Sequence, residues 1–224
     1  MVDPFELPEG AVIDDEDIWC QVLRQPRERG GPALFLDRDG TIIEEAHFLS
    51  DPDGVKLIPG AADVIAMANR RGIPVVVVTN QSGVGRGYYH WPEFAAVQAR
   101  MIDDLASEGA VIDAVYACPH HHEGQPPFDH GNHPARKPRP GMLRRAEEAL
   151  GIDLTASWIV GDHASDVEAG LNGGLSSAVH VLTGHGHREG QREKAVAVAS
   201  PKFRVEFAES LADVAGLAPF LARK

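Results

Sequence analysis

The sequence has few of the features that direct a chain to an oxidising compartment or a membrane. Its 224 residues include two cysteines, Cys20 and Cys118, which allow at most one disulfide and exclude a disulfide-rich scaffold. No apolar run approaches the roughly 20 residues that a membrane span needs. The first residues are acidic, which is the wrong charge for a signal peptide. We therefore expect a cytoplasmic protein that does not bind membranes.

Positive charge is scarce as well. The chain has 21 Lys and Arg against 33 Asp and Glu, a formal net charge of −12, whereas general nucleic-acid binding needs a basic face. The hydrophobic content of 43% is ordinary for a globular protein. This balance excludes nucleic acid as a partner and leaves room for a local basic pocket that binds a small phosphorylated substrate. A monomer is favoured, although the sequence does not specify the oligomeric state.

Short apolar runs alternate with helical patterns along most of the chain. Strands are predicted at residues 33–36, 74–78, 111–116, 158–160, 178–182 and 203–205. Helices are predicted at residues 61–71, 93–105, 142–150, from 167 onward and at 209–221. Strand and helix repeated with short connections predict right-handed crossovers and a mainly parallel sheet. The predicted fold class is therefore α/β, a Rossmann-like three-layer sandwich.

The chain divides into two regions. Residues 1–31 form an N-terminal extension, and residues 32–224 form the main domain. Within the extension, Asp14 is expected to cap a short helix whose apolar stripe consists of Ile18, Trp19, Val22 and Leu23.

The connections in the main domain differ in length and composition. A long loop with five histidines begins at Cys118, and its histidine-rich part spans residues 118–135. Residues 183–200 are polar and expected to be mobile, and residues 83–87 to form a flexible turn. No insertion is large enough for a cap domain.

Two carboxylates follow the first strand of the main domain. Alternate side chains of an extended segment share a face, so Asp37 and Asp39 are expected to point into one site, and Gly40 allows a sharp turn after them. One of two acids this close stays ionised, as a nucleophile or metal ligand, while its neighbour is pushed toward carrying a proton. The motif alone leaves open a surface turn of the same composition.

Polar residues also follow other strands or the long loop. They are Thr79 and Asn80, Arg136 and Lys137, and Asp162 and Asp166. Parallel strands present their carboxyl ends at one sheet edge, where open α/β folds bind ligands. Carboxylates suit Mg²⁺, and the hydroxyl, amide and ammonium groups suit phosphate oxygens. Together these residues predict phosphoryl-transfer chemistry.

Four motifs in this order resemble those of the haloacid dehalogenase superfamily of phosphatases. They are Asp37-Arg38-Asp39-Gly40-Thr41, Val78-Thr79-Asn80-Gln81-Ser82, Arg136-Lys137-Pro138, and Val160-Gly161-Asp162 with Asp166. The segment Cys118-Pro119-His120-His121 and the long loop are similar to one branch. That branch contains D-glycero-D-manno-heptose 1,7-bisphosphate 7-phosphatases and is related to histidinol-phosphate phosphatases. The resemblance covers about residues 32–182.

The resemblance implies the following roles. Asp37 attacks phosphorus and forms an aspartyl phosphate, and Asp39 acts as general acid and then general base. Mg²⁺ lies among the Asp37 carboxylate, the Asp39 backbone carbonyl and Asp162. Thr79, with Asn80, orients the phosphoryl oxygens, and Lys137 neutralises the charge on them. Asp166 orients either the metal ligands or the Lys137 ammonium without contacting the substrate. The implied substrate contacts are Asn80, Gln81, Ser82, Arg136, Glu45 and His47, although His47 also fits an ordinary loop histidine. Strand alternation, and not the resemblance, predicts that Arg38 points away from Asp37 and Asp39, so Arg38 receives no role.

The family's structural zinc site is incomplete in this sequence. Cys118, His120 and His133 stand at ligand positions, but Ala135 replaces the fourth ligand, and structural zinc sites usually have four. Another histidine of the loop, His121, His122 or His130, replaces it, or the loop binds no metal.

The main prediction is a Mg²⁺-dependent sugar-phosphate phosphatase, most specifically a heptose 1,7-bisphosphate 7-phosphatase. Histidinol phosphate or another small phosphomonoester is the alternative substrate. A non-catalytic phosphoacceptor module is the alternative from another class. It has no need of Asp39 beside its phosphoacceptor, so the presence of Asp39 favours an enzyme.

Overall fold

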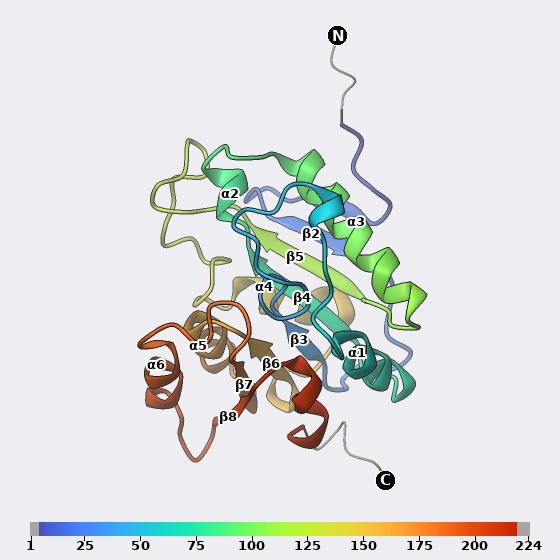
Figure 1. The fold of residues 1–224 in the computed structure, drawn as a ribbon, viewed down its shortest axis with the longest axis vertical. Helices are drawn as coiled ribbons and strands as arrows, with labels where there is room; N and C mark the ends of the chain where they lie inside the picture. The colour runs from blue at the N-terminus through green and yellow to red at the C-terminus, as the bar shows by residue number, and fades with distance from the viewer. Residues whose placement is uncertain (1–4, 219–224) are drawn as a thin grey trace.

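The computed structural model describes residues 5–218, which form one sheet with helices on both faces (Figure 1). Within this range the sheet has eight strands in the order β1-β2-β5-β4-β3-β6-β7-β8. The strands are β1 (Ala11–Ile13), β2 (Trp19–Val22), β3 (Leu34–Leu36), β4 (Val75–Asn80), β5 (Ala114–Cys118), β6 (Trp158–Gly161), β7 (Ser177–Val181) and β8 (Arg204–Ala208). The pairs from β5 to β8 are parallel, whereas β1 and β2 are antiparallel additions. The predicted α/β class with a mainly parallel sheet is confirmed.

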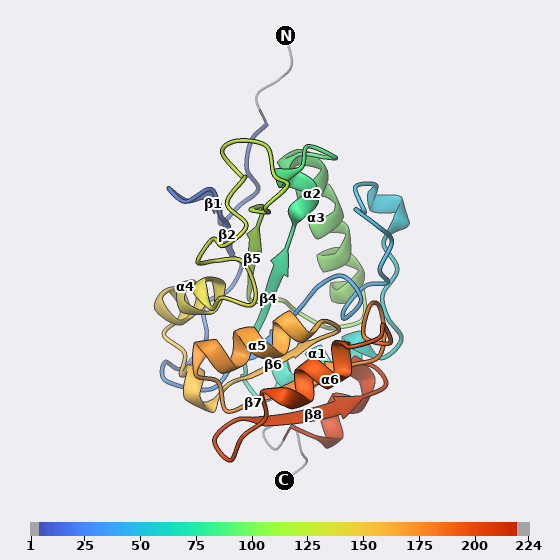
Figure 2. The same ribbon diagram turned by 90° about the vertical axis from the view of Figure 1, so that its left-hand side faces the viewer.

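The helices cover the two faces of the sheet (Figure 2). They are α1 (Ala61–Arg70), α2 (Ser82–Gly85), α3 (Trp91–Ser107), α4 (Gly141–Leu150), α5 (Ala164–Gly173) and α6 (Gln191–Ala197), with short 3₁₀ helices η1 (Pro52–Gly54), η2 (Leu154–Ala156) and η3 (Leu211–Gly216). One apolar core includes residues of α1, α3 and η3, and the other includes residues of α4, α5 and α6. This is the expected three-layer sandwich.

The central strands are apolar on both faces because both faces are covered. In β3, Leu34 and Leu36 belong to the core under α1 and α3, whereas Phe35 belongs to the core under α4 and α5. The valines of β4 alternate in the same way. Burying a side chain of this size stabilises a fold by about 1.5–3 kcal/mol, so a one-residue slip in either strand is strongly disfavoured. The buried apolar side chains thus fix the register of each strand and the position at which it ends.

The predicted N-terminal helix is wrong. Trp19 to Val22 form β2, which pairs antiparallel with β5, and β1 pairs with β2. The side chains of Trp19 and Gln21 are buried and those of Cys20 and Val22 half-buried, which is a strand pattern. Adding these strands pairs the backbone groups of β5 that would otherwise form a sheet edge. The extension therefore completes the sheet.

Three further local predictions need correction. The segment 183–200, expected to be mobile, contains α6, whose Ala195 is buried in the core. The expected turn at residues 83–87 begins inside the short helix α2. The expected closing helix at 209–221 is reduced to η3, and the part of that prediction beyond residue 218 lies outside the described residues.

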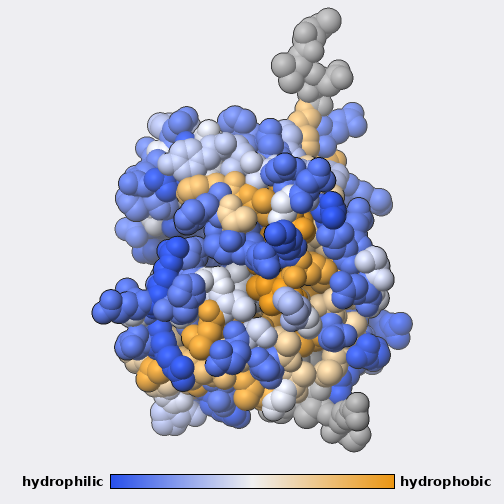
Figure 3. Space-filling view, viewed as in Figure 1, coloured by the Kyte–Doolittle hydropathy of each residue, from blue (hydrophilic) through white to orange (hydrophobic). Residues whose placement is uncertain are grey.

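No cap domain interrupts the described fold. Between β3 and β4 the chain forms a loop, η1 and α1, and between β4 and β5 it forms α2 and α3. On the face shown in Figure 3, hydrophilic residues dominate the rim and apolar residues gather toward the middle. Among the described residues, no helix combines the length and apolar character needed to cross a membrane.

Candidate active site

The predicted site residues meet at the carboxyl edge of the sheet. A cavity of about 770 Å³ opens there, beyond the ends of β3, β4 and β6. It is lined by every residue for which the sequence predicted a catalytic, substrate-binding or magnesium-binding role: Asp37, Asp39, Glu45, His47, Thr79, Asn80, Gln81, Ser82, Arg136, Lys137 and Asp162. Asp166 lines the same cavity.

Lys137 is at the centre of the buried charges. Its Nζ lies 2.6 Å from Asp37 Oδ1 and 2.6 Å from Asp166 Oδ1, and it donates to the Val78 carbonyl at 2.8 Å. Its side chain is 4% exposed, so these contacts replace the water that an ammonium group needs. Asp166 also accepts from the His163 backbone N–H at the start of α5. The structure therefore fixes Lys137 beside the proposed nucleophile.

The carboxylates of this group repel one another in a buried place. Burial raises the pKa of Asp37, Lys137 opposes that rise, and repulsion from Asp166 adds to it. Burial also raises the pKa of Asp162, reinforced by repulsion from Asp37 and Asp166. Burial alone would lower the pKa of Lys137, but Asp166 and Asp37 raise it above its usual range.

Asp37, Asp162 and Asp166, which we call the carboxylate cluster, fit a hard divalent cation. One oxygen of each lies within 4.8 Å of the others. Oxygen ligands in this number are what Mg²⁺ prefers, and a dication would relieve their mutual repulsion. Both oxygens of Asp166 are engaged, Oδ1 by Lys137 and Oδ2 by the His163 backbone N–H. The contacts of Asp37 with Lys137 and of Asp162 with the His185 N–H each use one oxygen, so Asp37 and Asp162 are the carboxylates available as ligands. The donor set thus fits Mg²⁺.

Asp39 is held by residues outside this cluster. Arg38 donates from Nε and Nη2 to the Asp39 carboxylate at 3.0–3.2 Å, and Gln81 Nε2 donates to Asp39 Oδ2 at 2.8 Å. Tyr89 in turn donates its hydroxyl to Gln81. Arg38, which the sequence left without a role, is 1% exposed and lies over the ring of Phe94. It fixes the orientation of the proposed acid–base group, and alternation along the strand gave no signal for this contact.

Thr79 and Asn80 bring the end of β4 to the rest of the site. The Thr79 hydroxyl accepts from Gln81 at 2.9 Å. Asn80 pairs in both directions with the Lys137 backbone, as acceptor at 3.0 Å and donor at 3.1 Å. These contacts anchor the end of the long loop to the sheet, and so they position the Lys137 side chain.

Two glycines let the loops after β3 and β7 meet at Asp162. Gly40 and Gly184 both have positive φ, 80° and 55°, and a Cβ on either would lie within 2.3 Å of Asp162 Oδ2. The Thr183 hydroxyl donates to the Gly40 carbonyl at 2.6 Å, and the His185 N–H donates to Asp162 Oδ2 at 2.6 Å. Residues 183–185 thus belong to the site, although the sequence assigned them none of its chemistry.

Arginines on the cavity wall supply positive charge for an anionic ligand. Arg136, as predicted, lines the cavity, and its Nη1 donates to the His120 carbonyl at 2.8 Å. Arg139 and Arg188 line it too and were missed. Arg139 directly follows the third motif, which was an available signal, whereas Arg188 lies in a segment without a pattern.

The predicted zinc ligands lie near one another without converging. The His120 and His133 rings stack at 3.9 Å between centroids and 5° between planes. His133 Nδ1 accepts from the Ala135 N–H, and a His120 nitrogen lies 3.0 Å from the Glu16 carbonyl. Across residues 5–218, no group of three clustered ligand atoms includes Cys118, His120 or His133. Zinc binding by this loop stays a prediction.

Comparisons with known proteins identify relatives of both halves of the chain. A model of haloacid dehalogenase-like hydrolases matches residues 34–118, and a HAD-hydrolase-like model matches residues 134–214. A D-glycero-beta-D-manno-heptose-1,7-bisphosphate 7-phosphatase from Mesorhizobium japonicum is 52% identical over 145 residues, which are 65% of this chain and 67% of that protein. The protein of the same name from Escherichia coli is 38% identical over 153 residues, 68% of this chain and 80% of its own.

Solved structures resemble the chain over a longer range. One from Mesorhizobium loti, described as a HAD-like phosphatase, has a TM-score of 0.79 and 39% identity and covers 99% of both chains. The D,D-heptose 1,7-bisphosphate phosphatase from B. bronchiseptica, in complex with magnesium and phosphate, has a TM-score of 0.69 and 32% identity over 83% of this chain and 97% of its own.

Proposed function

The chain belongs to the haloacid dehalogenase-like hydrolases, and we propose that it is a Mg²⁺-dependent sugar-phosphate phosphatase that works through an aspartyl phosphate. The observation that carries the proposal is the meeting of Asp37, Asp39, Lys137 and Asp162 around one cavity. The enzymatic class of the chain, phosphoric monoester hydrolase, is the class that the four motifs predicted.

In the first half-reaction an Asp37 carboxylate oxygen attacks phosphorus. The bond between phosphorus and the substrate oxygen breaks, and Asp39 donates a proton to the departing oxygen. Arg38 and Gln81 support this role because they fix the Asp39 carboxylate at the cavity wall. In the second half-reaction water attacks the aspartyl phosphate, Asp39 takes its proton, and inorganic phosphate leaves Asp37.

Lys137 and a bound Mg²⁺ would both stabilise negative charge on the phosphoryl group. The Lys137 ammonium, 2.6 Å from Asp37, lies where it can neutralise phosphoryl oxygens as charge develops. Asp37, Asp162 and the Asp39 backbone carbonyl would hold Mg²⁺, which offsets the repulsion between an anionic nucleophile and an anionic phosphate. Thr79 and Asn80 at the end of β4 are proposed to orient the transferred group, and Asp166 holds Lys137 in place.

We propose D-glycero-D-manno-heptose 1,7-bisphosphate, with release of its 7-phosphate, as the substrate. The relatives named above support this choice, and so does the cavity. Its volume of about 770 Å³ is within the usual range for small-molecule sites, and the wall residues Arg136, Arg139 and Arg188 suit a second anionic group. The predicted monomeric state and cytoplasmic location remain part of the proposal.

A phosphate-release assay with Mg²⁺ tests the substrate. We expect heptose 1,7-bisphosphate to have a higher kcat/KM than the corresponding heptose 7-phosphate, with histidinol phosphate lower still. Arg136→Ala should reduce kcat/KM for the bisphosphate more than for the monophosphate. Arg136 lines the cavity, and its guanidinium group is suited to bidentate contacts with an anion.

Arg144→Ala is the matched control, since Arg144 is an exposed arginine of α4 paired with Glu147. Preference for histidinol phosphate would replace the heptose assignment with the alternative substrate. Equal losses on the bisphosphate and monophosphate would mean that Arg136 does not recognise the second phosphate, and would remove this reason for preferring the bisphosphate.

Zinc in the histidine-rich loop is tested by metal analysis of the purified protein. Near one equivalent of zinc that falls on Cys118→Ser would support the prediction that Cys118, His120 and His133 are ligands. No zinc in the wild-type protein would leave the loop stabilised by its contacts with Glu16 and Ala135.

A further inference from the structure

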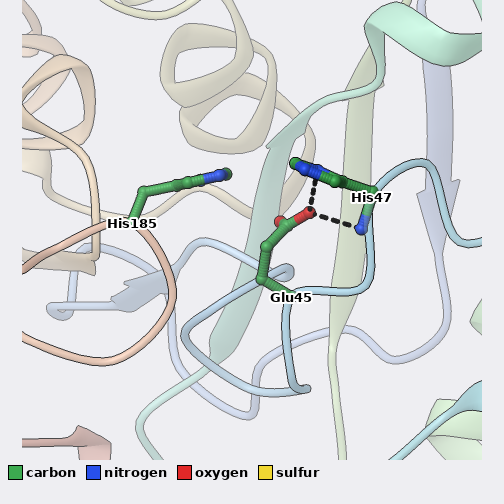
Figure 4. A group of neighbouring side chains, drawn as sticks. All are labelled: Glu45, His47 and His185. Atoms are coloured by element: carbon green, nitrogen blue, oxygen red, sulfur yellow. Dashed lines mark hydrogen bonds and ion pairs between the residues drawn. The ribbon is translucent and has the colours of Figure 1, made fainter. Parts of the chain in front are cut away.

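Outside the carboxylate cluster, Glu45, His47 and His185 bring three ligand side chains together at the cavity rim (Figure 4). Glu45 and His47 come from the loop after β3, and His185 comes from the loop after β7. We call these three residues the rim triad. The proposed phosphatase mechanism uses none of their side chains as catalytic groups.

The triad side chains converge. One ligand atom of each lies within 4.8 Å of the others. Figure 4 shows the His185 ring directed toward that of His47, with the Glu45 carboxylate beside them. His47 Nδ1 lies 3.8 Å from Glu45 Oε1, whereas ligands about 2.0–2.2 Å from a tetrahedral metal are roughly 3.4 Å apart. The His47 side chain is 82% exposed, so rotation about its side-chain bonds can close this difference.

The backbone holds the triad in this arrangement. His47 and Phe48 have positive φ, 42° and 56°, a conformation uncommon for residues other than glycine. Glu45 Oε1 accepts from the His47 backbone N–H at 2.9 Å, which supports that turn. On the other side, Gly184 packs against Gly40, so the loop that carries His185 is pressed against the start of the loop that carries Glu45.

The triad also has room for further ligands. Glu45, His47 and His185 line both the active-site cavity and a second cavity of about 570 Å³, so they stand in the wall between the two. A metal held by three protein ligands in such a wall keeps open positions for water or an anionic oxygen. Two imidazoles and one carboxylate are a ligand set of open zinc sites.

We propose that the rim triad binds a divalent transition-metal ion such as Zn²⁺ or Co²⁺, separately from Mg²⁺ at the carboxylate cluster. Imidazole ligands select the transition metal, because Mg²⁺ prefers oxygen. The ion links the loop after β3 to the loop after β7 and presents an open position to the cavity. This site does not depend on the proposed phosphatase activity.

Cobalt titration of the metal-free full-length protein in saturating Mg²⁺ tests the site. Mg²⁺ occupies the carboxylate cluster, and visible absorption of Co²⁺ then reports binding to nitrogen ligands. We expect one equivalent of Co²⁺ at the rim triad, in addition to any that the predicted zinc loop binds. His47→Ala and His185→Ala should each weaken binding by about 10–100-fold or more, since loss of a direct ligand costs at least as much as loss of an outer partner.

His187→Ala and Cys118→Ser are the matched controls. His187 is an exposed histidine of the same loop outside the triad, and Cys118 belongs to the predicted zinc loop. Both controls should keep the equivalent of Co²⁺ that depends on His47 and His185, and any further equivalent lost only in Cys118→Ser belongs to the predicted zinc loop. Glu45→Gln keeps the size of the side chain and should also weaken binding, which guards against a folding defect in either alanine variant.

Unchanged Co²⁺ affinity in the His47 and His185 variants would overturn the proposal, as would complete loss of Co²⁺ binding in Cys118→Ser or absence of Co²⁺ binding in the wild type. The titration measures bound metal, so a protein without phosphatase activity that still binds Co²⁺ at the triad would leave this proposal standing and overturn the other.

Discussion

The carboxylate cluster and the histidine-rich loop of residues 118–135 both have sequences typical of metal ligands, yet they differ in structure. Asp37, Asp162 and Asp166 bring their oxygens within 4.8 Å. In the loop, His120 and His133 stack face to face, and neither joins Cys118 in a ligand group among the described residues. The oxygens of the carboxylate cluster thus already converge as metal ligands do, whereas the predicted ligands of the loop do not.

The cause of the difference is where each ligand is attached. Asp37 directly follows β3 and Asp162 directly follows β6, and these strands are adjacent and parallel. Their register therefore fixes the distance between the two carboxylates. In the loop, Cys118 ends β5, but His120 and His133 are set by turns and contacts with other segments. Strand ends transmit sequence spacing into space much more faithfully than loops do.

The largest effect is expected where the cluster performs chemistry. Asp37→Asn should reduce kcat by a factor on the order of 10⁴ or more, because an amide is a poor nucleophile and lacks the charge of a metal ligand. Phosphate release measures it, with Asp63→Asn, an exposed acid of α1, as the control. Near-normal turnover in Asp37→Asn would remove the nucleophile from the mechanism.

Asp39→Asn should lower kcat by about 10²–10⁴-fold, the range for a general acid–base group. The loss should be smaller for p-nitrophenyl phosphate than for a sugar phosphate, because a good leaving group needs less protonation. Rate measurements on both substrates test the assignment. Equal losses would show that Asp39 acts beside the cluster as a structural charge and not as the acid.

Asp162→Asn sharpens the metal part of the comparison. It removes one anionic ligand, so the Mg²⁺ concentration for half-maximal activity should rise by roughly tenfold or more. Activity across a Mg²⁺ titration measures this shift. The same titration on His133→Asn should give the wild-type midpoint, and a matching shift there would mean that the loop also contributes to the magnesium site.

The smallest effect is expected at the thiol that ends β5. Burial raises the pKa of Cys118 to about 12, from about 9 in the unfolded chain, so the folded protein holds the thiol proton more tightly. This contribution to stability is complete below pH 9 and is lost as the pH rises toward 12. Urea midpoints measured from pH 8 to 11 should fall less steeply for Cys118→Ala than for the wild type. If the urea midpoints of both proteins fall equally steeply with pH, the raised pKa of Cys118 is contradicted. A Cys118 thiolate bound to a metal ion would produce that result.

Much of the architecture could be predicted from local pattern. The apolar runs that became β3 and β4 fix which strands are buried, and the polar residues directly after them reach the cavity. The N-terminal strands could not be predicted, because Trp19 to Val22 also fit a helical stripe. Residues 19–22 form a strand and not a helix because they pair with the edge of β5, which is far away in the sequence.

The sequence by itself determined the α/β class, the strand ends and the identity of the acids and the lysine that meet there. These follow from short-range periodicity and from the rule that parallel strands end at one edge. Tertiary structure alone decided that Arg38 turns to Asp39, that Gly40 and Gly184 admit two loops against Asp162, and that Glu45 and His47 meet His185. Each of these contacts joins side chains whose directions depend on packing between segments, which no local spacing encodes.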